Sequence, residues 1–227
     1  VDLMDEVEVE QVHRDDVVKI TTDSGELSAK TVVIATGAKW RLIGIPGEIE
    51  FRNKGVAYCT HCDGPLFKGK KVTVIGGGNS GIEAAIDLAG LAEEVLVLEF
   101  LPELKADSVL QDKLKTLSNV RVVTNAETKT LEGDGKLEKI RYVDRISGEE
   151  HEEATDGCFI QVGLVPVTEW VETIEKNNRG EIIVDEVGAT SMEGVFAAGD
   201  CTDSAFQQIV IAQGSGATAA LGGYQYL

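Results

Sequence analysis

A short β-run that leads straight into a cluster of glycines constrains this chain more than any other feature. The run is Lys71–Ile75 and the cluster is Gly76–Gly81. In a G-x-G-x-x-G pattern, the first glycine makes a tight turn, the second lets the backbone approach a pyrophosphate, and the third lets a helix pack on the strand. The helix N-terminus adds free N–H groups. The pattern predicts a dinucleotide site at Gly76, Gly77, Gly78, Asn79, Ser80 and Gly81, against the alternative of a glycine-rich turn without a ligand.

An acidic residue at the end of the next predicted strand indicates which dinucleotide binds. Glu99 can accept hydrogen bonds from both ribose hydroxyls of the adenosine, and it would repel a 2′-phosphate. The residues that follow, Phe100, Leu101 and Pro102, include no arginine to neutralise such a phosphate. NADH is therefore favoured over NADPH. The alternative is a strand-end glutamate that faces solvent.

A close pair of cysteines precedes the β-run. Cys59 and Cys62 are separated by two residues, and two thiolates differ from one disulfide by two electrons. A zinc half-site is one alternative, but no second pair accompanies it, because Cys158 and Cys201 are isolated. Two unrelated buried thiols are another alternative, although they would not need this spacing. We favour a redox disulfide.

Polar residues beside the pair are candidates for moving protons. Asp63 directly follows the second cysteine and could shuttle the proton that thiol–disulfide exchange requires. His61, between the cysteines, could do that work, tune a thiolate, or merely be exposed. We therefore include both with Cys59 and Cys62 as candidate catalytic residues.

A nicotinamide passes a hydride, whereas a disulfide is opened by a nucleophile at sulfur. A flavin bridges these two chemistries, so the combination points to FAD. Two glycine stops after apolar runs could hold it, namely Thr36-Gly37 and Gly199-Asp200, where Asp200 could bind a ribityl hydroxyl. An ordinary turn is the alternative at each place.

The rest of the pattern is that of an α/β protein with many tight turns. Apolar periodicity predicts helices over 80–90, 107–117 and 207–226, and strands over 71–75, 95–99, 120–124, 138–144, 158–162 and 181–184. A hairpin turn is expected at Asp23–Glu26, and Thr31–Ala35 reads as a strand buried on both faces. The glycines of the last helix require close packing or a ligand as compensation.

Charge and length exclude several partners. The net charge of −18 argues against nucleic acid and anionic membranes, since both would be repelled. No apolar run approaches the length of a membrane span. A chain of 227 residues does not need a disulfide framework for stability, so a cytoplasmic protein with a catalytic pair is the better fit.

Over nearly its whole length the chain resembles the flavin-dependent disulfide reductases of the low-molecular-weight thioredoxin reductase type. Within them it resembles most the reductase core of the alkyl hydroperoxide reductase flavoproteins, which form the F component of that system. The residues that carry the resemblance are Ala35–Arg41, Cys59–Lys70, Gly76–Gly90, Leu98–Phe100 and Gly194–Thr202.

The resemblance implies two Rossmann-like domains, with an NAD(H) domain inserted in an FAD domain. The expected FAD segments are residues 1–49 and 166–227, and the expected NAD(H) domain, with the cysteine pair, is 50–165. Electrons would pass from NADH to FAD, to the Cys59–Cys62 disulfide, and on to a thioredoxin-like domain or a peroxiredoxin. Cys62 would face the flavin, Cys59 would exchange with the partner, and Asp63 would be the acid–base residue. Gly199, Asp200, Gln208 and Ile209 would hold the flavin, and a homodimer is usual.

Some residues depart from the pattern of that family. Thr60 stands where the alkyl hydroperoxide reductase flavoproteins usually carry proline, and Gln207 replaces a usual basic residue. Residues 1–36 contain one glycine, Gly25, so the family's N-terminal flavin-binding βαβ unit is not found, nor is the thioredoxin-like module. We therefore expect a fragment that binds NAD(H) and, alone, binds FAD poorly.

Two other functions stay open. One is an enzyme of the same fold that reduces free thioredoxin. The other, from a different class, is a flavin-free, NAD-binding module without turnover, because a chain without flavin cannot join hydride and disulfide chemistry.

Overall fold

A computed structural model describes residues 2–227, and the chain divides into two compact units. The first comprises residues up to Lys39 together with Leu164–Leu227, and the second is Trp40–Gly163. The first transition lies ten residues before the boundary expected at residue 49. Residues 40–49 belong to the second unit because Ile43 and Ile45 pack on its core and the Glu48 side chain is buried there.

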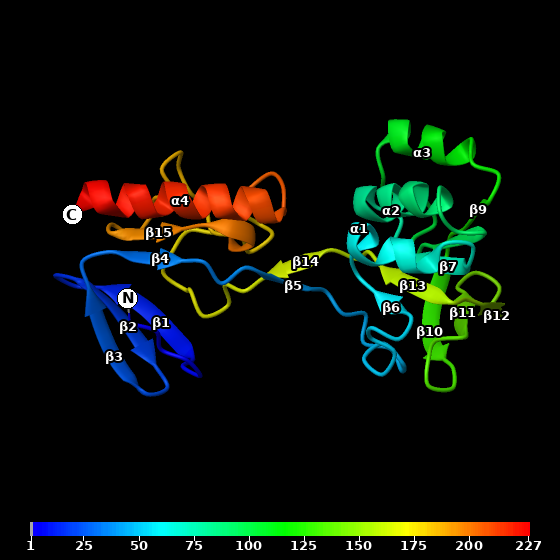
Figure 1. The fold of residues 1–227 in the computed structure, drawn as a ribbon, viewed down its shortest axis with the longest axis horizontal. Helices are drawn as coiled ribbons and strands as arrows, with labels where there is room; N and C mark the ends of the chain where they lie inside the picture. The colour runs from blue at the N-terminus through cyan, green and yellow to red at the C-terminus, as the bar shows by residue number, and fades with distance from the viewer. Residues whose placement is uncertain (1) are drawn as a thin grey trace. The chain divides into compact units, whose positions relative to one another are not determined.

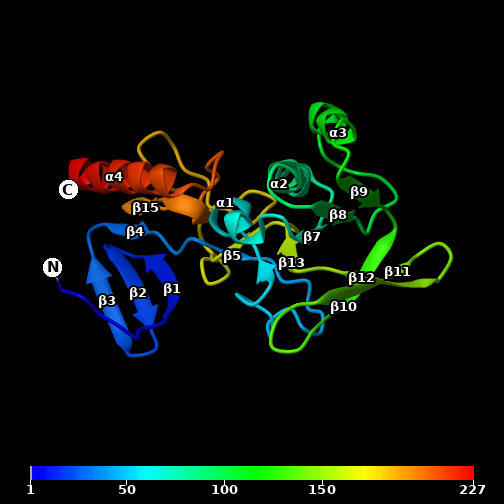
Figure 2. The same ribbon diagram turned by 45° about the vertical axis from the view of Figure 1, so that its right-hand side comes forward.

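The second unit is built on a five-stranded parallel sheet with the order β6-β13-β7-β8-β9. Its strands are β6 (Val56–Ala57), β7 (Lys71–Ile75), β8 (Glu94–Leu98), β9 (Val120–Val123) and β13 (Gly157–Ile160). The helices α2 (Asn79–Ala89) and α3 (Ser108–Lys115) lie on one face of the sheet (Figures 1 and 2). Ile82, Ala85 and Leu88 of α2 are buried against Val72 and Val74 of β7, because the 3.6-residue period places them on one face of the helix.

An antiparallel sheet covers the opposite side of this unit (Figure 2). It consists of β10 (Ala126–Glu132), β11 (Lys139–Asp144) and β12 (Glu150–Ala154). Leu131, Ile140 and Tyr142 from this sheet pack with Leu98 and Ile160 in a second core. The parallel sheet is therefore covered by helices on one face and by this antiparallel sheet on the other. A short helix α1 (Thr60–Asp63) and a 3-10 turn η1 (Gly64–Phe67) follow β6.

The first unit holds an antiparallel sheet, a parallel strand pair and the last helix (Figure 1). Its elements are β1 (Val9–Arg14), β2 (Val18–Thr22), β3 (Gly25–Ala29), β4 (Val32–Ile34), β15 (Val195–Ala197), the 3-10 turn η2 (Gly199–Cys201) and α4 (Ile209–Tyr226). Val12 and Val18 pack with Ile34 and Val195 in its core. The strands β5 (Ala38–Trp40) and β14 (Leu164–Pro166) pair where the chain passes from one unit to the other.

Most predicted elements are confirmed, with ends that differ by at most two residues. The helices, the β-α-β succession and the hairpin turn after β2 are present. The strand predicted over 181–184 is wrong: only Ile182 makes isolated bridges, to Lys176 and Thr202, so no ladder forms there. The prediction that 31–35 is buried on both faces is also wrong. Val33 is 42% exposed, so the face of β4 that carries it is not covered by the described residues.

The glycines of α4 have two different surroundings. A Cβ on Gly222 would lie 2.5 Å from the backbone oxygen of Val187, so close packing requires glycine there, as predicted. Gly214 and Gly216 have nothing within 4 Å of such a Cβ. Packing among residues 2–227 therefore explains only part of the glycine content of α4. Of the helices described, none is both long enough and apolar enough to cross a membrane.

Candidate functional site: a disulfide and a glycine turn in one unit

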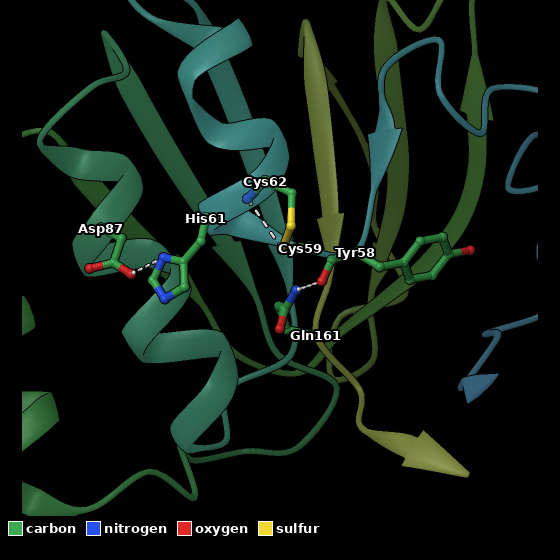
Figure 3. The surroundings of a disulfide bond; sticks show 6 residues. All are labelled: Tyr58, Cys59, His61, Cys62, Asp87 and Gln161. Carbon is green, nitrogen blue, oxygen red and sulfur yellow. Dashed lines mark hydrogen bonds and ion pairs between the residues drawn. A yellow bond between two sulfur atoms is a disulfide. The ribbon is translucent and has the colours of Figure 1, made fainter. Parts of the chain in front are cut away.

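Cys59 and Cys62 form a disulfide at the start of α1 (Figure 3). Cys59 is the N-cap of this short helix, and its Sγ accepts a hydrogen bond from the backbone N–H of Cys62 at 3.2 Å. Cys59 is half-buried and Cys62 is exposed. The disulfide predicted from the two-residue spacing is therefore present at an accessible position.

The two polar neighbours of the pair have different positions. The His61 side chain is 74% exposed and its Nδ1 lies 3.6 Å from Asp87 Oδ2 of α2, so it points away from the sulfur atoms (Figure 3). Asp63 is half-buried, and its backbone N–H donates to the carbonyl of Cys59 at 3.0 Å. Of the two candidates for proton transfer, Asp63 has the less exposed side chain.

The glycine turn lies at the carboxyl end of β7. Gly76 has φ +120°, and a Cβ there would lie 2.4 Å from the backbone oxygen of Gln161. A Cβ on Gly81 would lie 2.0 Å from the backbone oxygen of Gly76, which is the close approach of helix and strand that the pattern predicts. Nothing lies within 4 Å of a Cβ on Gly78, so space above the turn is open. These surroundings suit a bound pyrophosphate.

Two further residues of the predicted set, Asn79 and Ser80, have different surroundings. The side chain of Asn79 pairs with Asp107, whose backbone N–H donates to Asn79 Oδ1 at 2.8 Å. Asp107 is the N-cap of α3, so this pair joins the starts of two helices. Ser80 is exposed and lines a cavity of about 420 Å³ with Thr60 and His61. The sequence reasoning did not identify Asp107.

Glu99 is buried beside the turn, at 7% exposure, and both of its carboxylate oxygens accept backbone hydrogen bonds. The N–H of Gly77 donates to Oε2, and the N–H of Leu101 donates to Oε1 at 2.7 Å. The alternative of a solvent-facing glutamate is therefore wrong. The carboxylate joins the glycine turn to the end of β8, and it lines the cavity next to the turn.

That cavity has a volume of about 360 Å³. Besides Gly76 and Glu99, its lining includes Phe100 and the first residues of β10. The guanidinium of Arg145, after β11, lies 3.7 Å from the centre of the Phe100 ring and donates to the Phe100 carbonyl at 2.8 Å. Arg145 is not among the residues predicted for this site, because the prediction rests on the residues directly after Glu99. Its separation of 46 positions from Glu99 left no local signal.

The predicted flavin residues gather within the first unit. Thr36 and Gly37 follow β4, Gly199 and Asp200 follow β15, and these strands are parallel, so all four lie at one edge. The N–H of Gly199 donates to Ser215 Oγ of α4 at 3.0 Å, and Thr36 Oγ1 donates to the carbonyl of Val167 at 2.6 Å. Gln208 and Ile209, at the start of α4, are exposed.

The remaining cysteines are free and fully buried. Burial raises the pKa of the Cys158 thiol, and the charge of Glu48 acts in the same direction. The thiol of Cys201 donates to the carbonyl of Ala198 at 3.2 Å. Both are core residues of their units.

Comparison with known proteins matches this arrangement to a family. Residues 1–216 match the family described as pyridine nucleotide-disulphide oxidoreductase. The chain is 59% identical over 229 residues to a NADH dehydrogenase of Bacillus subtilis, covering 100% of this chain and 45% of that protein. It is 56% identical over 212 residues to the F component of alkyl hydroperoxide reductase in Escherichia coli, covering 92% of this chain and 41% of that protein.

Among solved structures, thioredoxin reductase from Streptococcus pyogenes matches with a TM-score of 0.85 at 36% identity, over 96% of this chain and 72% of that chain. The chain spans less than half the length of the two curated relatives, from Bacillus subtilis and Escherichia coli. The resemblance to the alkyl hydroperoxide reductase flavoproteins and the α/β, thioredoxin reductase-like fold are confirmed. With its glycine turn and its disulfide in one compact unit, this chain belongs to the pyridine nucleotide-disulphide oxidoreductase family.

Proposed function

We propose that the chain is part of an NADH-dependent, FAD-containing disulfide reductase. Electrons pass from NADH through FAD to the Cys59–Cys62 disulfide, and then to a thioredoxin-like domain or a peroxiredoxin. One observation carries the proposal: an accessible disulfide lies in the same compact unit as a glycine turn with open space above it. A two-electron store beside a dinucleotide site is the minimum that such a relay needs.

The second unit is the proposed NAD(H) domain. The open space above Gly78 and the cavity beside Glu99 support binding of a dinucleotide across the end of β7. The buried carboxylate of Glu99 favours a free ribose over a 2′-phosphate, so NADH is the proposed donor. The name of the Bacillus subtilis relative agrees with this choice.

The first unit is the proposed flavin-binding domain, formed by the segments on either side of the NAD(H) domain. Thr36, Gly37, Gly199 and Asp200 at one strand edge, with Gln208 and Ile209 at the start of α4, are the residues that would hold FAD. When bound, the flavin joins hydride chemistry to thiol chemistry. Nothing lies within 4 Å of a Cβ on Gly214 or Gly216, and this open space beside α4 suits a ligand or another segment lying close to it.

The cysteines have distinct proposed roles. After reduction of the pair, the Cys59 thiolate attacks the partner disulfide, forms a mixed disulfide and releases one partner thiolate. Cys62 then attacks Cys59 Sγ, which restores the Cys59–Cys62 disulfide and releases the second partner thiolate. Two electrons have moved to the partner, and Asp63 handles the proton of the attacking thiol. Cys62 is the residue that accepts electrons from the flavin side.

A second candidate keeps the same relay and changes its acceptor. Several solved structures that the chain resembles are thioredoxin reductases, which favours free thioredoxin as the partner disulfide. In either case we propose a cytoplasmic homodimer, in a compartment that keeps thiols reduced.

The test is NADH-dependent reduction of an aromatic disulfide by the purified chain with added FAD. NADH and NADPH binding are measured first by titration, so that nucleotide binding and turnover are separate readouts. We expect NADH to bind more tightly than NADPH. We also expect Cys59→Ser and Cys62→Ser each to abolish disulfide reduction while NADH binding is retained.

Three results would contradict parts of the proposed function. Turnover that survives both cysteine substitutions would refute the role of the pair. Absence of NADH binding would refute the nucleotide site. NADH binding with no turnover at any FAD concentration would favour the NAD-binding module.

A further inference from the structure

The residue directly before the redox pair is held by a buried carboxylate. Tyr58 is 6% exposed, and its hydroxyl donates to Glu48 Oε1 at 3.0 Å. Glu48 is 1% exposed, and it also accepts from the backbone N–H groups of Ile43 at 3.2 Å and Gly44 at 2.8 Å. A carboxylate is costly to bury unless its oxygens are paired, and here one of its three donors is the phenol of Tyr58.

Three more contacts fix the same tyrosine. Its ring stacks on Trp40 with centroids 5.8 Å apart, and the Arg52 guanidinium lies 5.6 Å from the ring centre. Its backbone carbonyl accepts from Gln161 Nε2 at 2.7 Å, directly beside the disulfide (Figure 3). Contacts from four residues in three separate segments of the chain therefore set the position of Tyr58, which is bonded to Cys59 through the peptide chain.

The position of Cys59 matters because one backbone N–H donates a hydrogen bond to its sulfur atom. The backbone N–H of Cys62 lies 3.2 Å from Cys59 Sγ. A thiolate at this place accepts the same hydrogen bond, and a hydrogen bond to a charged group is stronger than one to a neutral group. Holding Cys59 here therefore favours its thiolate, which is the form that attacks a disulfide.

We propose that Tyr58 is a positioning residue for Cys59, and that Glu48 and Gln161 act through it to keep Cys59 Sγ against the Cys62 N–H. This rests on the proposed function, in which Cys59 is the exchanging thiol. A purely structural tyrosine would stabilise the unit without changing the reactivity of the cysteine. A positioning tyrosine changes the pH profile of that reactivity.

The test uses the full chain with Cys62→Ser, which leaves Cys59 as its single accessible thiol, since Cys158 and Cys201 are fully buried. The rate of alkylation by iodoacetamide is measured against pH, with Tyr58→Phe or Gln161→Ala added. Each addition is expected to move the midpoint up by about half to one pH unit and to slow the reaction at pH 7 about three- to tenfold. Gln161→Ala supplies a second variant in case Tyr58→Phe lowers stability.

Tyr142→Phe is the matched control, because it removes the hydroxyl of another buried tyrosine of the same unit, one that stacks on His151. Its pH profile is expected to match that of the parent, which is the chain with Cys62→Ser alone. The inference is overturned if the folded Tyr58→Phe and Gln161→Ala variants also have the parent's profile. It is likewise overturned if Cys59 of the parent titrates as a free thiol near about pH 8.5.

A separate measurement distinguishes failure of this inference from failure of the proposed function. In the unsubstituted chain, dithiothreitol supplies two electrons and two protons, its thiols become a cyclic disulfide, and Cys59 and Cys62 become thiols. If the pair cannot be opened and closed reversibly in this way, the proposed function fails. If it can and the alkylation profiles do not move, only the positioning role fails.

Discussion

The glycines of the Gly76–Gly81 turn and those of α4 differ in what surrounds them. In the turn, an added Cβ on Gly76 or Gly81 would meet backbone oxygen at 2.4 Å or 2.0 Å. In α4, Gly214 and Gly216 would meet nothing within 4 Å. The turn needs glycine for reasons internal to its own unit. For Gly214 and Gly216 of α4, the described residues provide no such reason.

Apolar side chains show the same contrast. In α2, Ile82 and Leu88 are fully buried against the sheet. In α4, Ile209 is 80% exposed and Val210 is 70% exposed. Exposed apolar surface of this size gains stability when it is covered. The apolar face of α2 is therefore covered by contacts within its own unit, whereas the start of α4 presents apolar surface that a ligand or chain segment can cover.

The largest expected effect tests the internal requirement of the turn. Gly81→Ala places a Cβ against the Gly76 carbonyl, which cannot move without disturbing β7. We expect the free energy of unfolding of the second unit to fall by about 2–3 kcal/mol, as for an overpacked core. Chemical denaturation followed by circular dichroism measures it. An unchanged midpoint would show that the close approach is relaxed in solution.

The next largest effect concerns Glu99, whose carboxylate lies between the glycine turn and the neighbouring cavity. Glu99→Gln keeps the shape of the side chain but removes its charge, and its amide NH2 would face one of the two N–H groups, of Gly77 or Leu101, that the carboxylate now accepts from. We expect NADH to bind about tenfold more weakly, because hydrogen bonds to a charged group are worth more than neutral ones. The ratio of the NADPH dissociation constant to the NADH dissociation constant should also decrease.

The control for this measurement is Glu127→Gln, which removes another carboxylate from the lining of the same cavity. Both titrations follow nicotinamide fluorescence. Equal losses in the two variants would mean that the position of Glu99 has no special part in NADH binding.

A smaller effect depends on pH. Burial, with the hydrogen bond to Glu48, raises the pKa of Tyr58 to about 12 from an ordinary value of 10.0. The folded state thus favours the neutral phenol, so this contribution to stability is complete below pH 10 and is lost as the pH rises through about 12. Thermal unfolding between pH 8 and pH 12 should decline less steeply for Tyr58→Phe than for the parent. Parallel curves would contradict this assignment.

The smallest effect belongs to α4. Gly216→Ala fills open space and reduces the backbone freedom of the unfolded chain, so we expect it to stabilise the first unit by about 0.5–1 kcal/mol. This sign is opposite to that for Gly81→Ala. If FAD binds, and the substitution weakens FAD binding while it stabilises the unit, the ligand explanation for these glycines gains support.

Sequence predicts this fold well where the determining contacts are local. The turn from β7 into α2 follows from glycine spacing and helix period, and the disulfide follows from a two-residue interval. Contacts between distant segments were not predictable in this way. The contact of the Arg145 guanidinium with the Phe100 ring and the hydrogen bond from Tyr58 to Glu48 join distant segments. No hydrophobic period or sequence motif relates these segments. The strand expected over 181–184 failed for the same reason, because a strand also requires a partner to pair with.

The tryptophans give each unit its own optical signal. The chain contains two, Trp40 in the second unit and Trp170 in the first. Trp40 stacks on Tyr58, next to Cys59, whereas Trp170 packs against the core that contains Val12 and Ile34. In the single-tryptophan variants Trp170→Phe and Trp40→Phe, emission reports on one unit at a time. Cooperative melting of the redox unit and of the proposed flavin unit can then be recorded separately, in the same chain and without any attached dye.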